Sequence, residues 1–150
     1  MIKYTPLFRL LVDKEQMFAY TTTEVICVIS TPEELVMIKE CCLLPLMLDM
    51  VEKQRKDLET STTPMKSLYL AALLKLQDMI HADLVYTRNQ LRTADIKLWK
   101  VDASEVREKS AFKYEYMNKG YRGVFEMLRS LVKAELSKKF GQYIAKVFEK

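Results

Sequence analysis

Glycine and proline are scarce in this chain of 150 residues. The sequence has 3 glycines, at positions 120, 123 and 141, and 4 prolines. An all-β protein built from many short strands needs frequent tight turns, and these two residue types supply most of them. Their scarcity argues against such a fold and favours helices.

Long apolar runs are also missing. The most apolar window, from Cys41 to Leu48, is bounded by Glu40 and Asp49, whereas a helix needs about 20 apolar residues to span a bilayer. The first residues form only a short apolar patch, which Arg9 interrupts, without a small-residue cleavage site. We therefore expect no membrane segment and a cytoplasmic location.

Residues that usually carry chemistry are few. His81 is the only histidine, and Asp78 precedes it by one helical turn. Di-iron bundles need two such carboxylate–histidine pairs together with further carboxylates, so this pair alone predicts no metal site. No glycine cluster matches a phosphate-binding loop. We predict no metal, no cofactor and no catalytic residue.

The three cysteines, Cys27, Cys41 and Cys42, are odd in number, and the last two are adjacent. Neighbouring side chains on a helix point about 100° apart, so a disulfide between Cys41 and Cys42 would be strained. We expect reduced, buried thiols with raised pKa values, which opposes reactivity. A pocket near His81, Cys41 and Cys42 is the weakest functional alternative.

The middle of the chain predicts two long helices. Thr31-Pro32-Glu33-Glu34 combines a capping box with a proline in the first turn. The helix that begins there should run to about Leu58, with a kink or a break at Pro45.

The stretch from Pro64 to Trp99 has no glycine and no further proline. Apolar residues repeat along it with helical spacing, and two polar residues fall in the same stripe: Leu73, Gln77, Ile80, Leu84, Thr87, Leu91, Ala94 and Leu98. If it is one helix it is roughly 54 Å long, so either the bundle is elongated or the helix breaks near 93–96. Its first turns are apolar all round, which predicts deep burial there. The stripe beyond Gln77 is the expected interaction surface of this helix.

The last third predicts another long helix, which begins near Asp102 and contains Gly120 and Gly123 as weak points. Helical projection places nine apolar residues of this segment on one arc: Val106, Tyr114, Met117, Tyr121, Val124, Phe125, Leu128, Leu131 and Val132. A final short helix is expected from Gln142 to Phe148.

The start of the chain is open to two interpretations. Thr5-Pro6 and the following apolar residues favour a helix to about Tyr20, although alternation at Phe8, Leu10 and Val12 also fits a strand. Residues 24–30 have the highest β propensity and need a partner strand, either this first segment or residues 96–101.

With 49% hydrophobic and 29% charged residues, the chain is expected to fold as one domain over residues 1–150. The predicted fold is mainly α, an antiparallel bundle of about four principal helices, with a short N-terminal strand element as the open point.

Charge is distributed unevenly along the chain. Residues 1–60 have 7 basic and 10 acidic side chains, net −3, and residues 61–150 have 17 and 10, net +7. Basic residues and tyrosines alternate around position 116, as they often do on nucleic-acid surfaces. Candidate nucleic-acid contacts on the expected C-terminal helix are Lys113, Lys119, Arg122, Arg129 and Lys133.

These patterns favour binding over catalysis. The first hypothesis is a non-enzymatic helical interaction protein, a small regulatory or accessory factor that binds another protein or a second copy of itself as a homodimer. Its 9 methionines and 8 tyrosines suit adaptable protein contacts. The alternative is a DNA- or RNA-binding protein that uses the basic C-terminal helix.

Overall fold

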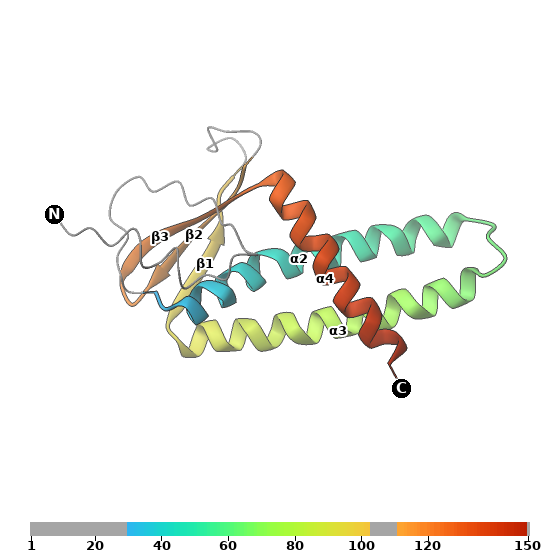
Figure 1. Cartoon of the computed structure of the whole chain (residues 1–150), viewed down its shortest axis with the longest axis horizontal. Helices are drawn as coiled ribbons and strands as arrows, with labels where there is room; N and C mark the ends of the chain where they lie inside the picture. The colour runs from blue at the N-terminus through green and yellow to red at the C-terminus, as the bar shows by residue number, and fades with distance from the viewer. Residues whose placement is uncertain (1–29, 103–110, 150) are drawn as a thin grey trace.

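The computed structural model describes residues 30–102 and 111–149, with the side chain of residue 111 excepted. Three helices and one three-stranded sheet make up this part of the chain (Figure 1). In chain order they are α2 (Pro32–Thr60), α3 (Lys66–Thr93), β1 (Ile96–Lys100), β2 (Ala111–Asn118), β3 (Tyr121–Leu128) and α4 (Arg129–Phe148). The predicted bundle of four principal helices is therefore wrong, because most of the third long helix is a β-hairpin. The predictions for residues 1–29 and for Val106 lie outside the described residues.

Helix α2 begins as its sequence predicts. The backbone N–H of Glu34 donates to the Thr31 hydroxyl over 3.2 Å, and the Thr31 N–H donates to the Glu34 carboxylate over 2.9 Å. This capping box satisfies N–H groups that have no partner inside the helix. The helix is not divided at Pro45 and continues to Thr60.

Helix α2 is also the centre of the fold. It lies alongside α3 for its whole length, and α4 crosses over both helices (Figure 1). Lys39 and Glu135 form a buried ion pair of 2.8 Å between α2 and α4, and Lys139 binds Glu40 one turn further on. Ile38, Cys42 and Met47 of α2 have no exposed surface. The neighbours on several sides explain why this part of α2 is apolar almost all round.

The predicted helix from Pro64 to Trp99 ends earlier than its stripe suggests. Helix α3 stops at Thr93, and Asp95 takes a left-handed conformation with φ 56° before β1 begins at Ile96. The residues predicted to be an interaction surface, Ile80 to Leu91, are instead the buried seam against α2, with Ile80 at 0% exposure. The prediction of an interaction surface there is wrong, because α2 of the same chain already covers the stripe.

The two glycines predicted inside a helix belong to a tight hairpin. Lys119 and Gly120 form its two-residue loop, with φ values of 50° and 85°. Both central residues of a type I′ turn need positive φ, which glycine adopts at little cost and which matches the twist of the paired strands. Gly123 faces Tyr116 across the hairpin, and a Cβ added there would lie 2.3 Å from the tyrosine ring. The ring thus occupies the space that a side chain would need.

The sheet has order β1-β2-β3 with antiparallel neighbours. Residues directly opposite each other share a face, so Tyr114 lies beside Phe125, and Asn118 lies beside Ile96 and Tyr121. Phe125 is buried, and this inner face packs into the core. Residues 96–100 form a strand, β1, that pairs with β2, whereas nearly all of the strand predicted at residues 24–30 lies outside the described residues.

Candidate functional site

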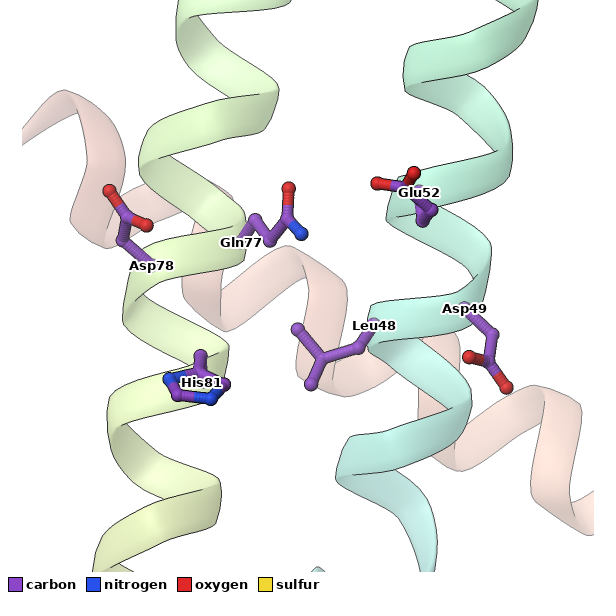
Figure 2. Close-up of a pocket in the computed structure, with 6 residues that line it drawn as sticks. All are labelled: Leu48, Asp49, Glu52, Gln77, Asp78 and His81. Atoms are coloured by element: carbon purple, nitrogen blue, oxygen red, sulfur yellow. The ribbon is translucent and has the colours of Figure 1, made fainter.

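One surface groove lies between the middle of α2 and the middle of α3. Its volume is about 310 Å³, and its lining residues are Leu48, Asp49, Glu52, Gln77, Asp78 and His81. In Figure 2, Leu48 and Gln77 point into the space between the helices, whereas Asp49 and Asp78 point away from it. Carboxylates that diverge cannot share a metal ion or act as an acid–base pair. In the described part of the chain no group of three or more His, Cys, Asp or Glu side chains is placed to hold a metal.

The cysteines lie apart from this groove. Cys41 and Cys42 are buried in α2 as free thiols, as predicted, and Cys27 lies outside the described residues. Burial raises the pKa of the Cys41 thiol to about 11 and raises that of Cys42 further. The thiolate is the reactive form, so neither thiol is suited to nucleophilic chemistry at neutral pH. The groove that His81 lines includes neither Cys41 nor Cys42, so it does not support the alternative of a pocket shared by these three residues.

The five candidate nucleic-acid residues do not share one helix. Lys113 and Arg122 lie on the outer face of the sheet, and Lys119 lies in the hairpin turn. Arg129 and Lys133 are exposed on the first turns of α4. The helix on which these residues were expected to line up does not exist, because the hairpin separates them.

The outer face of the sheet brings one aromatic residue close to one of these cations. The indole of Trp99 donates to the Glu115 carboxylate over 3.2 Å. The guanidinium carbon of Arg122 lies 5.9 Å from the centre of the Trp99 ring, a cation–π distance. Lys113 lies on the same face but opposite Glu126. Cations and carboxylates therefore alternate on this face.

The turn of the hairpin is joined to the start of α2 by a polar cluster that sequence reasoning missed. The Asn118 amide donates to the Glu34 carboxylate over 2.9 Å and to the Ser30 hydroxyl over 3.0 Å. Lys119 lies 3.6 Å from the same carboxylate. Burial raises the pKa of Glu34, but the bonds from Thr31 and Asn118 and the charge of Lys119 outweigh it and hold the pKa below its usual value. This cluster holds the sheet against α2 and is structural.

The largest departure from expectation is the apolar start of α3. None of the residues from Lys66 to Lys75 is buried, and Leu68 and Leu74 are about half exposed, at 53% and 51%. The α2–α3 turn and the helix ends next to it extend beyond α4 (Figure 1). We call this extension, residues 51–74, the arm. The sequence predicted deep burial for the first turns of α3, and that prediction is wrong.

Other exposed apolar side chains lie next to the front of the arm, the side that α4 crosses. Met50 continues the row Lys39, Leu43 and Met47 that faces α4, because the spacings of four, four and three keep one helix face. The Tyr143 hydroxyl of α4 donates a hydrogen bond to the Asp83 carboxylate of α3, so Asp83 lies on the face of α3 that α4 contacts. Leu76 lies two turns before Asp83 on the same face.

Continuing that row toward the arm by steps of three and four reaches Ala72, Tyr69 and Met65. The Lys75 ammonium donates to the Val147 carbonyl over 3.3 Å, which places the last turn of α4 beside α3, two turns from Leu68. We name these six exposed side chains the arm patch: Met50, Met65, Leu68, Tyr69, Ile144 and Phe148. Their exposed fractions run from 43% at Tyr69 to 71% at Phe148.

Exposed apolar side chains that gather on one surface are unusual on a monomeric protein and typically mark a binding surface. A sequence signal for it existed, since residues 61–77 are mostly apolar without a single acidic residue. The same composition also predicts a buried helix end, because sequence alone does not say how many neighbours a helix has.

No helix in residues 30–102 or 111–149 is long and apolar enough to cross a membrane. Neither a curated protein nor a solved structure matches the chain. The family described as YhjD protein matches residues 29–148, which includes nearly all of the described chain. The chain therefore belongs to the YhjD protein family.

Proposed function

We propose that this chain is a non-enzymatic binding module, a regulatory or accessory factor whose contact surface is the arm patch. The observation that carries the proposal is the exposure of the apolar first turns of α3, where no residue from 66 to 75 is buried. Removing about half of each of these side chains from water would favour association by roughly 25 cal/mol per Å² of apolar area. The free, buried Cys41 and Cys42 suit the reducing cytoplasm.

The residue types of the arm patch support a protein partner. Methionine, tyrosine and phenylalanine are enriched in protein interfaces, and all three occur among its six members. Methionine adapts its flexible side chain to differently shaped partners. The groove at His81 supports this function less well, because its charged side chains diverge.

Site-specific photocrosslinking in the native host tests this proposal. A benzoylphenylalanine at position 68 should give one discrete protein adduct that survives nuclease treatment. The same group at Val85, which is 44% exposed on the same helix outside the arm, should give none. Equal adducts at both positions, or an adduct destroyed by nuclease, would contradict a protein-binding arm.

A second candidate function rests on the outer face of the sheet. Trp99 with Arg122 above its ring resembles the aromatic and cationic pairs that stack on unpaired bases. This version of nucleic-acid binding uses the sheet in place of the helix that the sequence predicted. Binding of a fluorescent single-stranded oligonucleotide should weaken steeply with salt and should be lost in Trp99→Ala with Arg122→Glu. Unchanged anisotropy in that variant would exclude the sheet face.

A further inference from the structure

Basic side chains outnumber acidic ones in the parts of α3 and α4 that contain most of the arm patch, whereas the end of α2 carries both signs: Lys53, Arg55 and Lys56 together with Glu52, Asp57 and Glu59. The two basic segments are residues 61–77 and residues 129–148. Their basic residues are Lys66, Lys75, Arg129, Lys133, Lys138, Lys139 and Lys146. Their only acidic residue is Glu135, and its carboxylate is 2.8 Å from the buried Lys39 ammonium. The surface offered to a partner is therefore apolar at its centre and basic along its α3 and α4 edges.

We infer that the arm patch binds an amphipathic helix whose apolar stripe is flanked by aspartate and glutamate. This inference rests on the proposed function and adds the chemistry of the partner. An apolar stripe would cover the exposed side chains, and acidic flanks would face the lysines of α3 and α4. Complementary charges around an apolar centre raise the association rate and disfavour wrong partners.

The shape of the surface favours a helix over a bilayer. Met65, Tyr69 and Ala72 follow one another at spacings of four and three, so they form a stripe about 10 Å long on α3. Ile144 and Phe148 lie on α4, which crosses in front of the α2–α3 pair and so occupies a different layer (Figure 1). A helix that lies along the arm would touch both layers at once, whereas a flat bilayer surface reaches one of them.

Charge also argues against a second copy as the occupant. Two identical surfaces would bring the lysines of α3 and α4 of both copies together. Like charges that face each other across an interface cost several kcal/mol. An acidic partner avoids this repulsion.

A display selection against the purified full chain tests the inference. The library consists of amphipathic helices with fixed apolar positions of mixed Leu, Ile, Met and Phe, and with flanking positions open to Asp, Glu, Lys, Gln and Ser. We expect enriched helices to carry mostly Asp and Glu at the flanks. Their affinity, measured by fluorescence anisotropy, should fall at least tenfold in Leu68→Ser with Phe148→Ser.

Two control variants separate apolar and charge effects. Val85→Ser with Tyr86→Ser removes two exposed apolar side chains elsewhere on α3, and affinity should change less than twofold. Lys75→Glu with Lys146→Glu should lower affinity at least fivefold. The same change of net charge in Lys97→Glu with Lys100→Glu, two exposed lysines of β1, should have less than a twofold effect. Circular dichroism of each variant verifies that it is folded.

Each outcome decides between the two proposals. Enriched helices with neutral or basic flanks would overturn the acidic partner and leave the binding module intact. The absence of any helix that distinguishes the chain from its Leu68→Ser, Phe148→Ser variant would overturn both.

Two other occupants have their own readouts. Sedimentation with phosphatidylglycerol vesicles, lost in the same variant while no helix is enriched, would assign the surface to lipid and overturn both proposals. A dimer in sedimentation velocity that this variant dissociates would assign the surface to a second copy and overturn the acidic helix.

Discussion

Two apolar stretches of this molecule have opposite surroundings. Residues 38–51 of α2 and residues 65–74 of α3 are both apolar on nearly every helix face. The first has α3, the sheet and α4 as neighbours and contains most of the buried core, whereas the second contains no buried residue. A helix that is apolar on all sides would be stabilised by burial of every face. Whether burial occurs within the chain depends on how many other helices and strands pack against that helix.

The largest expected effect comes from truncating the seam between α2 and α3. Ile80→Ala should lower the free energy of unfolding by about 3 to 4 kcal/mol, because it leaves a cavity at a side chain with 0% exposure. Leu74→Ala on the same helix, where the side chain is 51% exposed, should change it by about 0.5 kcal/mol or less. Urea denaturation of both variants measures the difference. Equal losses would mean that the arm is as well packed as the core.

A smaller effect is expected at the hairpin. Gly123→Ala should cost about 1 to 2 kcal/mol, because its Cβ would displace the Tyr116 ring that now lies 2.3 Å from that position. In a Tyr116→Ala background the same change should cost little, since the space is then open. A double-mutant cycle in urea measures this coupling, and additive effects would contradict the contact.

The start of α2 should respond to acid. Because the pKa of Glu34 is lower in the folded protein than its usual value, its stabilising effect is present above the unfolded pKa and is lost as the pH falls through the folded pKa. Between about pH 5 and 3 the native chain should therefore lose about 1 kcal/mol more stability than Glu34→Gln, the usual contribution of a helix cap. Parallel pH dependences of the two proteins would exclude this role for Glu34.

The smallest effect on stability is expected on the arm patch itself. Leu68→Ser with Phe148→Ser should change the free energy of unfolding by less than about 1 kcal/mol, because both side chains are more than half exposed. Thermal denaturation checks this value. A large loss would show that these residues stabilise the fold, and would weaken their assignment to a binding surface.

The sequence predicted features that depend on neighbours along the chain. The capping box at Thr31 and Glu34 needs only four consecutive residues, and the burial of Cys41 and Cys42 follows from an apolar run on both sides. The hairpin was missed although its signal was local. Phe112, Tyr114 and Tyr116 alternate with polar residues before a Lys-Gly turn, but Tyr114 also falls on the apolar arc of a helical projection, together with Met117 and Tyr121.

The candidate site was less predictable than the fold. The sequence identified apolar, acid-free turns at the start of α3 and a basic C-terminal region, but it assigned the former to the core and the latter to a helix that does not exist. The exposure of Leu68 depends on where α4 crosses the α2–α3 pair, and that position is set by contacts such as Lys39 to Glu135, separated by 96 residues in sequence. No local pattern contains such a contact.

By itself the sequence determined the start of α2, the buried thiols and the apolar stripe of α3, because capping and helical periodicity are properties of a few adjacent residues. Only the tertiary structure decided which apolar surfaces became core and which remained exposed. Burial depends on the number of elements that meet at a residue, and in this protein three elements surround α2 while α3 begins beyond the reach of α4.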